Sequence, residues 1–195
     1  MRAALDRLIS WTGILLALVL LVAGGLLTWA NMFIADQVDQ QLSDQEIVMP
    51  TEEAIEADEA LTDEDREVLR EFAGTPLDDG PKAKAYADNY ILKHMEATTG
   101  GETYSSLGAV QREACADPDS EECAEVNAQR ETAFKGNTLR GLLLYGYAFA
   151  TMGTIAGYAA IGAFVGAVLL LLLAGLGLRH AKRAEDERRA GVTTA

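Results

Sequence analysis

Two long runs without a charged residue dominate the pattern of this 195-residue chain. The first extends from Leu8 to Ile34, and the second extends over 38 residues from Gly141 to Leu178. A helix needs about 20 apolar residues to cross the hydrocarbon core of a bilayer. The pattern therefore predicts two transmembrane helices, at residues 11–33 and 141–178. The first run is longer than the apolar core of about 7–15 residues in a secretory signal, so we expect a retained anchor, with a cleaved signal as the alternative.

The polar region between the runs predicts a small helical domain at residues 34–140. Residues 50–74 are typical of one or two short acidic helices, with Thr51 and Thr62 as N-caps. Alternation with period two is nearly absent from the chain, so little strand is expected. The predicted fold is all-α, with the two transmembrane helices flanking this domain.

A further helix is predicted at residues 82–101, where a glycine pair, Gly100 and Gly101, ends the pattern. Apolar side chains recur at helical spacing along it and form one face, which comprises Tyr86, Ala87, Tyr90, Ile91 and Met95. Residues 124–140 are also helical in pattern and lead directly into the second uncharged run.

The net charge of the chain is −14, and its charged residues are distributed unevenly between the middle region and the two ends. Residues 33–140 carry 26 acidic and 9 basic side chains, whereas residues 1–10 carry two basic and one acidic, and residues 179–195 five basic and three acidic. Short basic tails stay in the cytoplasm. We therefore expect a multi-pass protein of the cell membrane with both termini cytoplasmic and an extracytoplasmic middle. Such an acidic middle argues against nucleic acid as a partner.

Several longer stretches resemble one family of proteins. They are LTWANMFIADQVDQQL, GPKAKAYADNYILKHMEATTGGETYSSLG, ADPDS and FKGNTLRGLLLYGYAFATMGTIAGYAAIG, and together they cover most of the chain. In these stretches the chain resembles a family of small two-span membrane proteins from actinobacteria. The resemblance implies the two-span architecture and no established activity, although some relatives carry the label "aromatic ring-opening dioxygenase".

The two histidines argue against that label. A ring-opening dioxygenase holds non-haem iron with two histidines and a carboxylate. The predicted topology puts His94 outside and His180 in the cytoplasm, about 30 Å of hydrocarbon apart. We expect His94 to be partly buried and hydrogen-bonded to a neighbour, with a pH switch as the alternative. His180 is expected to anchor the end of its span.

Cys115 and Cys123 are the two cysteines of the chain, and they enclose an acidic loop. Thiols in an extracytoplasmic segment are usually oxidised, so a disulfide is the favoured interpretation. Free thiols and a metal site remain as alternatives. A calcium loop of the EF-hand type starting at Asp117 would need glycine and glutamate where the chain has Glu122 and Ala128. We therefore predict no metal and no cofactor.

Small residues form a stripe on the second predicted span. It includes Gly153, Gly157, Ala160, Gly162 and Gly166. Glycines four residues apart let helix backbones approach closely in lipid. The first span is one expected neighbour of this stripe. Because the small residues cover about half of the circumference, we also expect a second helix, from another copy or another protein.

The second run is also too long for one bilayer, since 38 helical residues reach about 57 Å. Its outer part should project beyond the hydrocarbon core and must be covered. No phosphate loop, nucleophile elbow or zinc motif is present in the sequence. We therefore expect a protein without catalytic activity, an accessory or scaffold subunit of a cell-membrane complex with an integral membrane partner or further copies of itself. A sensor of an extracytoplasmic ligand or calcium is the alternative.

Overall fold

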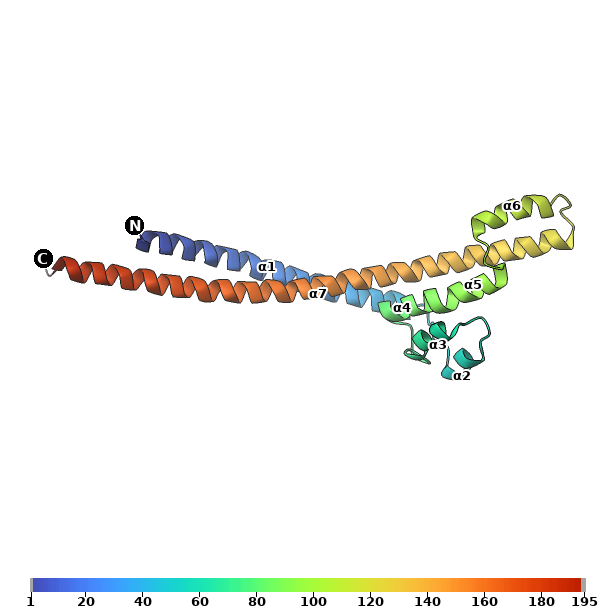
Figure 1. The fold of residues 1–195 in the computed structure, drawn as a ribbon, viewed down its shortest axis with the longest axis horizontal. Coiled ribbons are helices and arrows are strands. Elements are labelled where there is room, and N and C mark those ends of the chain that lie inside the picture. The colour runs from blue at the N-terminus through green and yellow to red at the C-terminus, as the bar shows by residue number, and fades with distance from the viewer. Residues whose placement is uncertain (1, 194–195) are drawn as a thin grey trace. The chain divides into compact units, whose positions relative to one another are not determined.

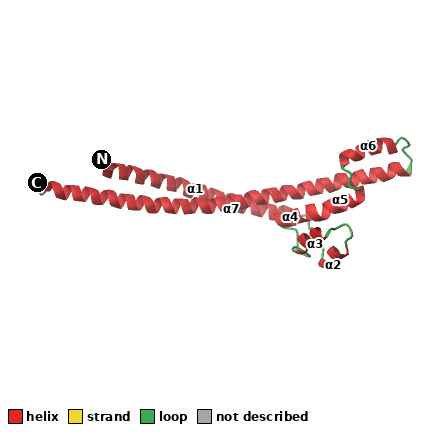
Figure 2. Ribbon diagram, viewed as in Figure 1, coloured by secondary structure: helices red, strands yellow, loops and turns green. Residues whose placement is uncertain are grey.

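The computed structural model describes residues 2–193, and every regular element in that range is a helix (Figures 1 and 2). The helices are α1 (Arg2–Ser43), α2 (Glu52–Ala57), α3 (Asp63–Arg70), α4 (Gly80–Tyr86), a π-helical turn η1 (Ala87–Ile91), α5 (Leu92–Thr99), α6 (Tyr104–Ala114) and α7 (Glu121–Thr193). An isolated antiparallel β-bridge joins Val48 and Pro76. The predicted all-α fold, with two long apolar helices on either side of a small helical region, is confirmed.

The chain forms two compact units. The helix-pair unit comprises Met1–Phe33 and Met152–Ala195, and the helical-cluster unit comprises Ile34–Thr151. Helices α1 and α7 contribute residues to both units.

In the helix-pair unit, α1 and α7 pack through small residues that recur every seven positions. Buried positions on α1 include Ser10, Ala17 and Gly24. Those on α7 are Gly153, Ala160, Ala167, Ala174 and Ala181. The pair is antiparallel, because Gly13 lies against Ala174 and Gly24 against Phe164. Such residues allow the close backbone approach that supports helix association in lipid.

The outward faces of this pair consist mainly of large apolar side chains. Leu15, Leu18, Ile161 and Leu172 are each at least 60% exposed. The most apolar windows of the two helices are only 11% and 17% buried, unlike the core helix of a soluble protein. Both helices are long and apolar enough to cross a membrane.

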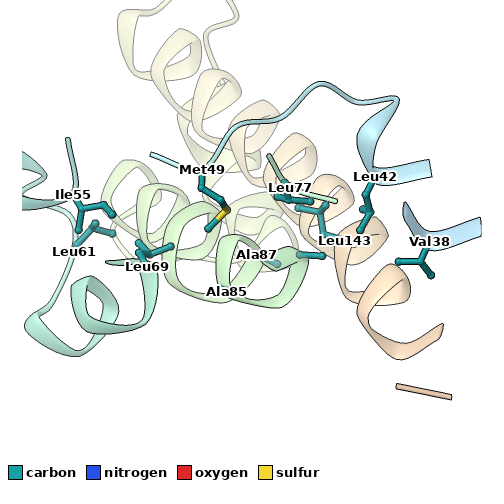
Figure 3. Packing of buried hydrophobic residues seen from close by; sticks show 11 residues of the cluster. Val38, Leu42, Met49, Ile55, Leu61, Leu69, Leu77, Ala85, Ala87 and Leu143 are labelled. Carbon is teal, nitrogen blue, oxygen red and sulfur yellow. The ribbon is translucent and has the colours of Figure 1, made fainter. Parts of the chain in front are cut away.

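The helical-cluster unit has its own hydrophobic core (Figure 3). Short helices α2 and α3 contribute Ile55 and Leu69, and the end of α1 contributes Val38 and Leu42. The other core residues are Met49, Leu61, Leu77, Ala83, Ala85, Ala87 and Leu143. The segment before α2 and the segment before α4 are hydrogen-bonded to each other, since the Met49 amide donates to the Thr75 carbonyl at 2.9 Å.

Local signals in the sequence account for most helix ends in the cluster. The Thr51 hydroxyl accepts from the Ala54 amide, and Thr62 forms a reciprocal capping box with Asp65. Gly100 adopts a left-handed conformation at the end of α5, with φ 64°. These three ends lie where the sequence predicts them.

Two features differ from the helices expected from sequence. Helix α1 continues to Ser43, past the polar residues that follow the first uncharged run, because Val38 and Leu42 on it are buried in the cluster core. The helix expected at residues 82–101 contains the π-helical turn η1. Within that turn the Asn89 amide side chain donates to the Ala85 carbonyl at 3.2 Å. The hydrophobic spacing gives no sign of this turn.

Candidate functional site

The charge-free segment of α7 inside the cluster, from Gly141 to Thr151, has one covered face. Leu143 is fully buried, and Gly146 lies against the Leu42 side chain. Gly80 at the start of α4 packs on the same segment, so closely that a Cβ there would lie 2.5 Å from the Ala150 Cβ. Part of the apolar surface that the sequence leaves to be covered is therefore covered by α4 and by the end of α1.

The other face of the segment is exposed. We define the α7 outer face as Leu142, Tyr145 and Phe149, which are 57%, 67% and 57% exposed. Their spacing of three and four residues places them on one side of the helix. An exposed apolar stripe of this kind is typical of a contact surface.

Charged side chains join α7 to α4 and to the π-helical turn η1. Arg140 of α7 donates to a carboxylate oxygen of Asp88 on η1 at 2.8 Å, and Lys84 forms a second ion pair with Asp88. Burial raises the pKa of Asp88, but the hydrogen bonds and charges of Lys84 and Arg140 together lower it below its ordinary value. The Lys84 ammonium also lies over the Tyr147 ring, 5.6 Å from its centroid. These contacts hold the α7 segment that carries the α7 outer face against α4 and η1.

His94 on α5 joins the short acidic helices to the rest of the cluster. Its Nε2 lies 3.0 Å from a carboxylate oxygen of Asp58, and its Nδ1 lies 2.8 Å from the Tyr90 carbonyl. The ring packs against the Tyr90 ring in a tilted arrangement, with centroids 4.3 Å apart and an interplanar angle of 45°. The expectation of a partly buried histidine with a hydrogen-bonded neighbour is confirmed. Because both nitrogens face acceptors, only the doubly protonated ring can donate to both.

Cys115 and Cys123 form a disulfide that closes the hairpin between α6 and α7. The Asn127 side chain lies beside it, with Nδ2 3.4 Å from the Cys123 sulfur. Gln111 links Asn127 to Arg130, and the Arg130 guanidinium covers the Tyr104 ring at 4.5 Å. The hairpin is therefore held by a covalent bond and by a row of polar contacts.

The acidic loop of this hairpin uses its polar groups locally. An Asp117 carboxylate oxygen accepts from the Asp119 amide, and the Ser120 hydroxyl donates to the Asp117 carbonyl. Over the described range, no group of three or more His, Cys, Asp or Glu side chains could hold a metal ion. A calcium sensor stays the alternative that the sequence leaves open.

The small stripe on α7 is divided in the helix-pair unit. Gly153 and Ala160 are buried, and Gly157 and Gly166 lie against Asn31 and Leu20 of α1. Gly162 is exposed, and a Cβ there would meet nothing within 4 Å. Most of the stripe therefore faces the first long helix, and Gly162 lies outside that contact.

One polar contact between the two helices was missed by the sequence analysis. The Asn31 side chain on α1 donates to the Gly153 carbonyl on α7 at 2.8 Å. The available signal was a single amide residue near the end of an otherwise apolar run. At the other end of the helix-pair unit, His180 Nδ1 lies 3.0 Å from an Asp6 carboxylate oxygen, and Arg7 pairs with Glu185.

Comparison of the chain with protein-family models, with curated proteins and with solved structures found no match. The resemblance to two-span actinobacterial membrane proteins therefore stays a prediction.

Proposed function

We propose that this chain is a non-catalytic, two-span membrane protein that serves as an accessory or scaffold subunit of a cell-membrane complex. The α7 outer face is its docking surface, and another integral membrane protein is its partner. The exposure of Leu142, Tyr145 and Phe149 carries this proposal. The basic tails favour cytoplasmic termini and an extracytoplasmic cluster.

Lipid alone is a poor cover for this surface. Tyr145 precedes Arg179, the first charged residue after the uncharged run, by 34 residues. That distance corresponds to about 51 Å of helix, against about 30 Å for a hydrocarbon core. The α7 outer face therefore lies beyond the acyl chains if Arg179 marks the cytoplasmic boundary. An apolar protein surface is the cover that remains.

Site-specific photo-crosslinking in native membranes tests the proposal. A photoreactive amino acid replaces Tyr145 in the full-length protein, and one at Glu67, an exposed residue of α3, is the control. We expect one discrete adduct with an integral membrane protein from position 145 and none from position 67. Leu142→Glu or Phe149→Glu should abolish the adduct without unfolding the cluster, because both side chains are exposed.

Two other outcomes would overturn the proposed subunit role. Adducts with lipid alone would show that the surface is a membrane contact. Adducts with a second copy of this chain alone would indicate a homo-oligomer without a separate partner. Mass spectrometry of the crosslinked peptide distinguishes these outcomes.

A further inference from the structure

The helix-pair unit contains an open groove of about 390 Å³, within the size range of small-molecule sites. Thr28 and Asn31 of α1 form one wall. The α7 residues that line it are Thr154, Gly157, Tyr158, Ala160, Ile161 and Phe164. The groove exists because the residues at its base are small, and it therefore follows from the same stripe that lets the helices approach.

Polar groups gather at one end of the groove. One N–H of the Asn31 amide donates to the Gly153 carbonyl, while its second N–H and its oxygen have no hydrogen-bond partner within residues 2–193. Tyr158 brings a phenol to the same end and is 72% exposed. An occupant that covers these donors shields them from water, and an amide left unpaired in that way is costly, so the donors favour an occupant with acceptor atoms.

The groove becomes apolar toward its other end. Ile161 is 61% exposed, and the Phe164 ring lies against Gly24. Counted along α7 from Arg179, Gly157 is at about 33 Å and Phe164 at about 23 Å. The hydrocarbon core is about 30 Å thick. The polar end therefore lies at the boundary of the core and the apolar end lies inside it.

We propose that this groove binds one glycerophospholipid from the leaflet at the Asn31 end of the helix pair. An ester carbonyl of the lipid accepts from the second Asn31 N–H or from the Tyr158 hydroxyl. One acyl chain lies along Gly157, Ile161 and Phe164. The order of polar and apolar groups in the groove matches the order along a lipid molecule. This inference rests on the membrane insertion proposed above and adds the ligand class of a defined site.

Photolabelling of the purified full-length protein in phosphatidylcholine vesicles tests the inference. The probe is phosphatidylglycerol with a diazirine in the middle of one acyl chain. We expect labelling of residues 158–164 that saturates with probe concentration and falls with unlabelled phosphatidylglycerol. Ether-linked phosphatidylglycerol, which has the same headgroup and chains but no ester carbonyls, should compete poorly. Leu15 and Leu18, on the exposed side of α1, should label without saturation.

Matched variants separate the groove from general lipid contact. Gly157→Leu should reduce the saturable labelling at least fivefold, whereas Gly162→Leu, the same change at an exposed position, should leave it unchanged. Gly157→Leu also presses on Asn31, whose Nδ2 lies 3.1 Å from the added Cβ position. Tyr158→Ala removes an exposed side chain and adds no atom near Asn31, and it should reduce the saturable labelling by a similar factor.

The remaining outcomes overturn the inference in distinguishable ways. If both helices were labelled but labelling at residues 158–164 did not saturate, the groove would make only ordinary lipid contact. The proposed membrane insertion would still hold. Labelling of the outward faces with none in the groove would show that another protein segment fills it. Absence of labelling from both helices would contradict the membrane insertion itself.

Discussion

Gly80 at the start of α4 and Ala150 on α7 are in such close contact that no side chain fits at position 80. A Cβ there would lie 2.5 Å from the Ala150 Cβ and 3.4 Å from the Tyr147 Cα. Both obstacles belong to the rigid helix α7 rather than to the end of a flexible side chain. The cluster therefore depends on glycine at this position for space.

The first prediction concerns this contact. Gly80→Ala should destabilise the helical cluster by about 1–3 kcal/mol, because overpacking forces the backbones apart. Hydrogen exchange of α4 amides in the detergent-solubilised full chain measures this loss. Gly141→Ala is the control, since a Cβ there meets nothing within 4 Å, and it should stabilise α7 by up to about 1 kcal/mol. Equal effects of the two changes would contradict the packing argument.

The second prediction concerns the bond between the two long helices. Asn31→Leu should weaken the helix pair by about 0.6 kcal/mol and by no more than about 1.7 kcal/mol, the average and the maximum measured for hydrogen bonds between membrane helices. Fluorescence of Trp11 and Trp29 during titration with sodium dodecyl sulfate reports the unfolding. Thr12→Val is the control, because the Thr12 hydroxyl donates to Leu8 in its own helix. A midpoint unchanged by Asn31→Leu would show that the bond adds no stability.

The third prediction concerns pH and the Asp88 carboxylate. Its pKa is lower in the folded protein than in the unfolded chain, so its stabilising contribution is complete above the ordinary carboxyl range. That contribution is lost as the pH falls through the lowered folded pKa. Asp88→Asn should cost about 1.5–3 kcal/mol at neutral pH, as for hydrogen bonds to charged groups, and should reduce the acid dependence. Unfolding followed between pH 2 and pH 7 checks both.

A matched carboxylate provides the comparison for Asp88. Glu131 pairs with Lys135 on α7, and its hydrogen bond to Lys135 lowers its pKa as well. The pair is exposed to solvent, where ion pairs contribute little. Glu131→Gln should therefore leave the stability at neutral pH unchanged. An effect as large as that of Asp88→Asn would mean that net charge, not the Arg140 contact, governs the acid response.

The fourth prediction concerns the hairpin of α6 and α7. Cys115→Ser should make opening of this hairpin easier by about 2–3 kcal/mol, from the chain entropy of so short a loop. Hydrogen exchange of residues 104–130 should accelerate, while the amide of Leu69 in the separate α3 core keeps its protection. Reduction of the wild-type disulfide should give the same pattern. Unchanged exchange after reduction would show that the polar row from Arg130 to Asn127 is sufficient.

Patterns of hydrophobicity and capping predicted the helical elements well, because these are local signals. The two uncharged runs, the Thr51 and Thr62 caps and the end at Gly100 follow from neighbouring residues alone. The contact between Gly80 and Ala150 could not be predicted this way, since it joins residues distant in sequence. The same limit applies to the pairs of Asp88 with Arg140 and of Asn31 with Gly153.

The contact made by the small stripe on α7 could be predicted only in part. The sequence identified a broad arc of small residues on α7, and most of that arc lies against α1. It did not identify which of them lie outside the contact, as Gly162 does. That depends on the angle at which two helices meet, which spacing along one helix does not specify. The α7 outer face likewise could not be predicted from the sequence, because it depends on which side of α7 is covered by α4.

The seven-residue repeat of small residues creates an ambiguity of register between α1 and α7. A slide of one helix by seven residues would again place small residues opposite small residues. Asn31 removes this ambiguity, because the Gly153 carbonyl is open to it where Gly157, four residues later, has no side chain. After such a slide Phe164 or Ala150 would take the place of Gly157, where an added Cβ would lie 3.1 Å from the Asn31 Nδ2. One amide thus selects a single alignment of two otherwise repetitive helices.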